Sequence, residues 1–181
     1  MDELNIVNKE ELFLKKDESA EAEEHVDRSQ IVVFKLGGEE YAMMIDEIKE
    51  VVVTPNIAKV PLMPSYIKGV ANVRGNILAV LDLEEKFGML KEGETEAQSK
   101  KNYILVVESQ THKMAILVQE VPNTLTILDS QIDASPNVVV NDEREGDFIK
   151  GLVRLENRLI ILLDIFSIIS KDILQAENKE S

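Results

Sequence analysis

Short runs of apolar residues, separated by turn-forming residues, dominate the chain from Gln30 onward. The first two runs, IVVFKL and EYAMMI, flank Gly37-Gly38, a residue pair typical of a tight hairpin turn. The runs are short and rich in β-branched residues, which favours strands over helices. The pattern predicts strands at Ile31–Leu36, Glu40–Ile45, Ile48–Val53, Gly69–Arg74, Asn76–Leu81, Asn102–Glu108, Met114–Val121, Thr124–Leu128, Phe148–Leu155 and Arg158–Ile165.

Two helices are expected among these strands. Asp82 precedes LEEKFG as an N-cap, and Gly88 ends that short helix. A final helix is predicted from about Asp164 to Leu174, where apolar residues recur at helical spacing. The proline-punctuated stretch from 55 to 64, the charged stretch from 91 to 101 and the polar stretch from 132 to 146 are predicted loops.

The chain contains an internal repeat. Tyr66–Leu83 aligns without gaps with Phe148–Ile165, and a weaker match sets Ala42–Val52 against Ala115–Leu125. Each unit then holds roughly five short strands, a size suited to a small closed barrel that leaves few exposed edges. Identical residues in the first match are Ile67, Lys68, Gly69, Leu81 and Asp82, which recur as Ile149, Lys150, Gly151, Leu163 and Asp164.

The repeat separates residues that the fold needs from residues free to serve another role. The glycine, the alternating aliphatic residues and the capping aspartate recur, so they are expected to be structural. Asn72, Arg74 and Gly75 have no counterpart in the second unit, which weakens a purely structural interpretation of them.

Composition divides the chain further. Residues 1–28 hold ten acidic and four basic side chains and are predicted to be a mostly disordered extension. Residues 29–174 form the expected folded domain, with subdomains of about 29–100 and 101–174; an exchange of strands between them is left open. Residues 175–181 are a predicted disordered tail.

Charge and composition exclude several classes of protein. A net charge of −14 repels phosphate backbones, so nucleic acid is not an expected partner. The absence of cysteine excludes disulfides and thiolate metal sites. No apolar run approaches the ~20 residues of a membrane helix, and the N-terminus lacks a signal-peptide pattern. We therefore expect a cytoplasmic protein that does not insert into membranes.

Catalysis finds little support in the residues. The repeated Asp82 and Asp164 could form the acid pair of a hydrolase, but each follows a strand and precedes a helix, where a carboxylate caps the helix. His25 and His112 are isolated, and neither a calcium-loop spacing nor a phosphate-binding loop is present. No cofactor and no metal are expected.

Arg74 is the candidate for binding. An arginine on a hairpin among aliphatic residues can present its fork of donors to the carboxylates or carbonyls of a partner. Glu50, in IKEVVV, can pair with Arg74 and orient it. From the chemistry alone, a partner contact and an internal ion pair are equally supported.

Two segments carry a family resemblance: FKLGGEEYAMMIDEIKEVV, and VPLMPSYIKGVANVRGNILAVLDLEEKFG after it. Within the second, GVANVRGNILAVLDL matches G-V-I-N-L-R-G-x-I-x-P-V-I-D-L, the hallmark of chemotaxis coupling proteins with CheW-like domains. The chain resembles this family from about Gln30 to Leu174. Two departures are Ala79, where proline is common, and Gln119, where aspartate is frequent.

The resemblance implies a mainly β fold of two five-stranded SH3-like β-barrels packed together, with short connecting helices and a C-terminal helix. It implies a non-enzymatic adaptor that is recruited to membrane receptor arrays through its partners. Those partners are the cytoplasmic tip of methyl-accepting chemoreceptors and the regulatory domain of a CheA-type histidine kinase. The residues expected to couple to the receptor are Ile48, Glu50, Val51, Asn72, Arg74 and Gly75.

Two alternatives remain at this point. One is a coupling protein of a related array that controls surface motility or a second-messenger output. The other, less favoured, is a hydrolase that uses the pair Asp82 and Asp164.

Overall fold

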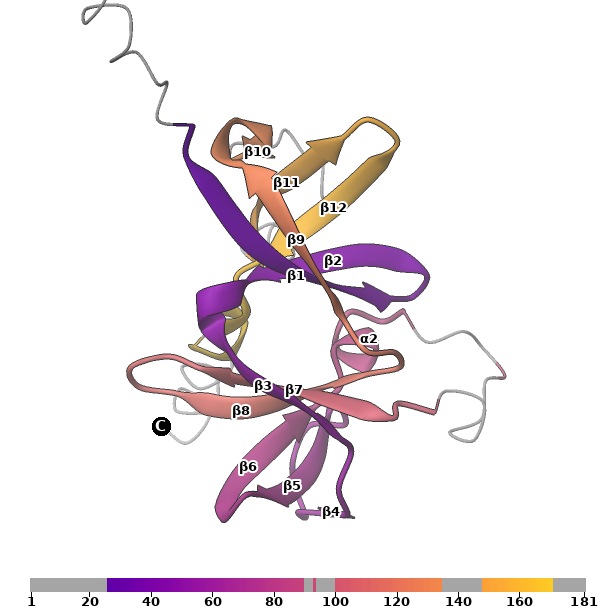
Figure 1. Ribbon diagram of the computed structural model, residues 1–181. Helices are drawn as coiled ribbons and strands as arrows, with labels where there is room; N and C mark the ends of the chain where they lie inside the picture. Colours follow the sequence, from indigo (N-terminus) through magenta and orange to yellow (C-terminus); the bar gives the residue numbers. More distant parts are fainter. Residues whose placement is uncertain (1–25, 90–92, 94–99, 135–147, 171–181) are drawn as a thin grey trace, which may run out of the picture.

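The computed structural model describes residues 26–89, 93, 100–134 and 148–170, and these residues form mainly β-structure (Figure 1). Of the two tails predicted at the ends of the chain, only residues 26–28 belong to the described part. The elements of the first unit are β1 (Arg28–Leu36), β2 (Glu39–Met44), η1 (Ile45–Glu47), β3 (Ile48–Val53), β4 (Ile57–Ala58), β5 (Ile67–Val73), β6 (Asn76–Leu81) and α2 (Leu83–Lys86). Those of the second unit are β7 (Tyr103–Glu108), β8 (Lys113–Val118), β9 (Asn123–Leu128), η2 (Asp129–Gln131), β10 (Ile132–Asp133), β11 (Ile149–Leu155) and β12 (Arg158–Leu163).

The strands form two sheets, each of which is a barrel of the SH3-like kind. One has the order β10-β11-β12-β2-β1-β9 and is called barrel A; the other has the order β3-β7-β8-β6-β5-β4 and is called barrel B. Figure 1 shows the two barrels one above the other. The expected mainly β fold is confirmed, but each sheet has six strands instead of five. The additional strands, β4 and β10, are two residues long and lie in segments predicted as loops.

The two units exchange their first hairpins. β1 and β2 come from the first unit but pair with β9 and β12 of the second, while β7 and β8 pair with β3 and β6 of the first. The strand pairs that join the two units are equivalent in both sheets: β12 runs parallel to β2, and β6 runs parallel to β8. A chain division near residue 100 therefore does not separate the two sheets.

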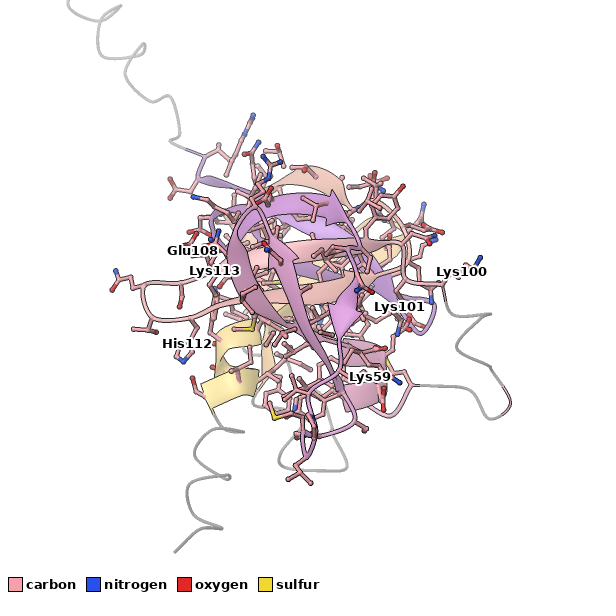
Figure 2. The ribbon with its side chains drawn as sticks, turned by 90° about the horizontal axis from the view of Figure 1, so that it is seen from below. Lys59, Lys100, Lys101, Glu108, His112 and Lys113 are labelled. Atoms are coloured by element: carbon pink, nitrogen blue, oxygen red, sulfur yellow. The ribbon has the colours of Figure 1, made fainter. Side chains whose placement is uncertain are left out.

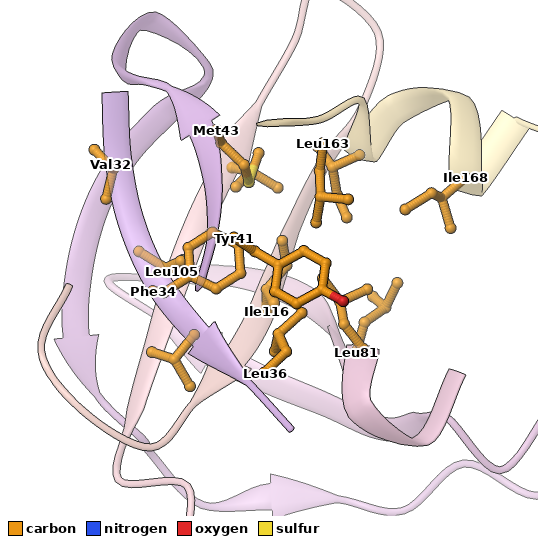
Figure 3. Packing of buried hydrophobic residues seen from close by; sticks show 14 of the residues in the cluster. Val32, Phe34, Leu36, Tyr41, Met43, Leu81, Leu105, Ile116, Leu163 and Ile168 are labelled. Carbon is orange, nitrogen blue, oxygen red and sulfur yellow. The ribbon is translucent and has the colours of Figure 1, made fainter. Parts of the chain in front are cut away.

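The exchanged hairpins are buried on both faces. In β1, Ile31 and Val33 point into barrel A, while Val32 and Phe34 point into the core between the barrels. The corresponding residues of β7 are Ile104 and Val106 inside barrel B, and Leu105 and Val107 between the barrels. Figure 3 shows the shared core, where residues of β1 and β2 meet residues of β6, β7, β8 and β12. A strand buried on both faces has no polar side, which explains the continuous apolar runs.

Gly69 and Gly151 recur because another strand passes close to each of them. A Cβ added at Gly69 would lie 2.1 Å from the carbonyl oxygen of Ala58 in β4, and Gly69 has a φ of +142°. A Cβ at Gly151 would lie 2.8 Å from the carbonyl oxygen of Asp133 in β10. Each hairpin also has a register irregularity immediately before its glycine. The structural role predicted for the repeated glycine is confirmed.

The helices and strand ends depart slightly from the prediction. The helix after Asp82 ends at Lys86, two residues before Gly88. The C-terminal helix is present at 165–170, and the remainder of its predicted span lies outside the described residues. β8 ends at Val118, so the predicted extension to Val121 is wrong; the chain leaves barrel B there to enter barrel A.

Candidate partner-binding surface

The turn between β5 and β6 holds Arg74 in an unusual backbone conformation. Val73 pairs with Asn76, so Arg74 and Gly75 alone form the loop, with φ values of 51° and 86°. Positive φ at both positions is the signature of a type I′ turn, which favours asparagine and glycine. An arginine there costs about 1 kcal/mol of backbone strain.

Asn72 stabilises this turn from the preceding strand. The backbone N–H of Gly75 donates a hydrogen bond of 2.8 Å to Oδ1 of Asn72. The side chain of Asn76 donates a longer bond, 3.4 Å, to the carbonyl of Val73. Because the turn is fixed at both ends, the base of the Arg74 side chain has a defined direction.

Glu50 completes the orientation of Arg74. The distance from Arg74 Nε to Glu50 Oε2 is 2.7 Å, so the ion pair expected from the sequence is confirmed. Glu50 lies on β3, at one end of the sheet order of barrel B, and the pair spans from there to the β5–β6 turn. The Arg74 side chain nevertheless remains 75% exposed, against 25% for Glu50. The pair therefore directs an arginine that is still available to a partner.

Exposed apolar side chains lie on the strands that carry the pair. Val51 follows Glu50 on β3 and is exposed, and Ile77, which is paired with Asn72 across the hairpin, is 65% exposed. Ile48 is less exposed than Val51 and Ile77, because it is half-buried and packs against the core between the barrels. It is therefore not included in the surface. We define the coupling surface, the candidate site of partner contact, as Glu50, Val51, Asn72, Arg74, Gly75 and Ile77.

Ile77 is the residue of this surface that the sequence analysis missed. It lies in an apolar strand, NILAVL, where its exposure depends on how β6 joins the barrel. The repeat could not reveal it, because the equivalent residue, Leu159, is also apolar, and a recurring apolar residue is expected to be structural; the structure exposes both.

The corresponding hairpin of barrel A has a different construction. Its turn residues, Glu156 and Asn157, do not share the positive φ of Arg74. Arg154 pairs with Asp133 at 3.2 Å, and Arg158 donates two hydrogen bonds to Glu40, which lower the pKa of that carboxyl. The strained, outward-directed arginine is thus a feature of barrel B within the described hairpins.

The two repeated aspartates cap helices. Asp82 Oδ1 accepts a hydrogen bond from the backbone N–H of Glu85, and Asp164 Oδ1 accepts one from the N–H of Ser167. The remaining Asp164 oxygen accepts from the Ser167 hydroxyl at 2.7 Å. The predicted cap role is confirmed. Each carboxylate binds the start of its own helix, whereas an acid pair would share a proton between the two carboxylates. Among the described residues, no cluster of three or more acidic, histidine or cysteine residues could hold a metal ion.

A family model described as the CheW-like domain matches residues 30–172 of the chain. The chain belongs to the CheW-like domain family. Similar family members include the chemotaxis protein CheW of Thermotoga maritima, 30% identical over 78% of this chain and 88% of the relative. The chemotaxis protein CheW of Helicobacter pylori is 27% identical over 90% of this chain and 96% of the relative.

A solved structure supports the same family. The scaffolding protein TtCheW from Thermoanaerobacter tengcongensis is 32% identical, with a TM-score of 0.66 over 77% of this chain and 90% of that chain. In this CheW-like domain the coupling surface lies in the matched region, on barrel B. None of the helices among the described residues combines the length and apolar character that a membrane crossing requires.

Proposed function

We propose that this CheW-like domain is a non-enzymatic adaptor that couples chemoreceptors to a CheA-type histidine kinase in chemotaxis arrays. It binds the cytoplasmic tip of a methyl-accepting chemoreceptor and the regulatory domain of the kinase at the same time. It acts in the cytoplasm and reaches the receptor array through these partners. The observation that carries the proposal is the exposed Arg74, held on a strained turn inside the segment that matches the family hallmark.

The coupling surface suits a helical partner such as a receptor tip. The free edge of the Arg74 guanidinium can donate to carboxylates or carbonyls on helices, and Glu50 limits the directions in which it points. Ile77 adds an exposed apolar side chain on the same hairpin as Arg74, and Val51 adds one on β3. A charged centre with apolar neighbours is the usual composition of an energetically important contact.

Barrel A provides a separate surface for the kinase. Leu159, on β12 of barrel A, is an apolar side chain that is 55% exposed. Because the two proposed surfaces belong to different barrels, one partner need not displace the other.

Co-sedimentation tests the adaptor function. Receptor-containing membranes, the kinase and this protein are mixed, and the kinase in the pellet is measured with and without this protein. We expect the kinase to sediment only when the protein is present. Equal sedimentation of the kinase in both mixtures would contradict the proposal.

A further inference from the structure

A buried cluster of charged side chains lies outside the coupling surface. Lys101, two residues before the start of β7, has a side chain only 7% exposed. Its Nζ is 2.5 Å from Asp82 Oδ2 and 2.9 Å from Glu84 Oε2, and both carboxylates are as buried as the lysine. Figure 2 shows the position of Lys101 on the molecule. Burying these three groups requires that they remain paired, because an unpaired buried charge is strongly destabilising.

Glu84 connects this cluster to the other barrel. Its second oxygen, Oε1, accepts a 2.9 Å hydrogen bond from the backbone N–H of Gly37, in the turn between β1 and β2 of barrel A. The same oxygen accepts a 3.4 Å bond from Gln119, at the end of β8. All the other groups of the cluster belong to barrel B, so the bond to Gly37 is its direct link to barrel A.

The same turn is also packed against the segment that follows α2. A Cβ added at Gly37 would lie 3.3 Å from both Cβ and Sδ of Met89. The backbone N–H of Met89 donates to the carbonyl of Glu84. Glu84 is therefore linked to the turn by its own bond to Gly37 and also through Met89. Figure 1 shows α2 beneath the tip of the β1–β2 hairpin. The hairpin tip is therefore held by a polar and an apolar contact at the same place.

Lys101 controls whether this link can persist. Without the ammonium group, Asp82 and Glu84 are two buried carboxylates that repel each other. Turning Glu84 towards solvent relieves this repulsion and breaks its bond to Gly37. The lysine of barrel B thus determines a contact made with barrel A.

We propose that Lys101, Asp82 and Glu84 form a clasp that fixes the orientation of barrel A relative to barrel B. A role of the clasp in setting the spacing between receptor and kinase rests on the proposed adaptor function. The clasp itself depends only on the contacts described above and is tested without either partner.

The chain is suited to a distance measurement because it contains no cysteine. Spin labels are attached at Val53→Cys on β3 and Thr126→Cys on β9, both exposed and on different barrels. The distance distribution is compared in the parent, in Lys101→Met and in Glu84→Met, which removes the acceptor of the Gly37 N–H and leaves Lys101 paired with Asp82. Glu108→Gln, which removes a charge from the exposed pair with Lys49, is the matched control.

We expect a narrow distribution in the parent and the control, and a broader or shifted one in both clasp variants. Hydrogen exchange of the Gly37 amide should be at least about fivefold faster in the clasp variants, because that amide loses its acceptor. Should Lys101→Met fail to fold, Glu84→Met decides the outcome, because it removes the same bond and leaves no unpaired carboxylate. An unchanged distribution together with unchanged Gly37 exchange would overturn the clasp.

Binding measurements then separate the clasp from the adaptor function. Clasp variants should bind receptor and kinase individually as the parent does, but recruit less kinase to receptor membranes. Failure of the parent to recruit kinase would refute the adaptor function and leave the distance and exchange results as the test of the clasp.

Discussion

Arg74 occupies a turn position at which asparagine or glycine would fit with less strain. The ion pair with Glu50 recovers little of that cost, because a largely exposed pair is worth about 0–1 kcal/mol. Local stability therefore gives no reason for an arginine at this position. A contact with a partner gives such a reason, because strained residues often lie at functional sites.

Replacing Arg74 by alanine should separate binding from stability. Arg74→Ala removes the guanidinium from the coupling surface, and we expect receptor pull-down to fall by tenfold or more while the melting temperature changes by only a few degrees. Arg154→Ala is the matched control, because Arg154 is similarly exposed and also pairs with a carboxylate, that of Asp133, but on barrel A. A large loss of melting temperature with unchanged pull-down would show that Arg74 is structural.

Gly69 allows a test of the close packing between β4 and β5. Gly69→Ala places a Cβ 2.1 Å from the Ala58 carbonyl oxygen, a backbone atom that cannot move without shifting β4. We expect a loss of about 3 kcal/mol or more in the free energy of unfolding, measured by urea denaturation. Gly38→Ala is the control: it has a positive φ of 91° but nothing within 4 Å of the added Cβ, so only about 1 kcal/mol should be lost. Equal losses would mean that strain, and not the close strand, requires Gly69.

Between elements, a repeated residue can take different partners in the two units. Lys68 on β5 pairs with Glu85 of the neighbouring helix, within barrel B. Its equivalent, Lys150 on β11, pairs instead with Glu47 of η1, where the chain crosses from barrel A to barrel B. The repeat predicts that both lysines are present, but it does not predict their partners.

Glu47 makes this crossover sensitive to pH. Burial raises the pKa of Glu47 above its ordinary value of 4.5, despite opposing contributions from Lys150 and the N–H of Met44. The folded state then binds the proton more tightly than the unfolded state does. The contribution of Glu47 to stability is greatest below pH 4.5 and is lost as the pH rises through its folded pKa.

Urea denaturation of the parent and Glu47→Gln between pH 4.5 and 7 measures this effect. The free energy of unfolding of the parent, relative to the variant, should decrease as the pH rises, because only the parent carries the titrating group. A difference that stays constant, or increases, over this range would contradict the assignment.

Across the whole molecule, the exchange of hairpins makes each barrel depend on both halves of the chain. β1 and β2 bury one face in barrel A and the other against barrel B. Each large aliphatic side chain buried in this way contributes about 2 kcal/mol, so a hairpin deprived of its partners loses most of what stabilises it.

Fragments divided after residue 100 test this dependence. Neither residues 26–100 nor residues 101–170 should fold alone, because each would retain a hairpin without its partner strands. An equimolar mixture should recover the β-sheet circular dichroism and the dispersed amide spectrum of the intact chain. Cooperative unfolding of either fragment alone would show that the exchange is not required for stability.

The sequence by itself determined ten of the twelve described strands, the repeat and the two capping aspartates, and it offered Glu50 as a partner for Arg74. These follow from local patterns: alternation of apolar residues, turn chemistry and a hallmark motif. Only the tertiary structure decided which hairpin belongs to which barrel, because two similar units offer similar strand edges to one another. It also decided that Ile77 is exposed and that Glu84 reaches Gly37, since burial and contacts between barrels depend on how distant strands meet in space.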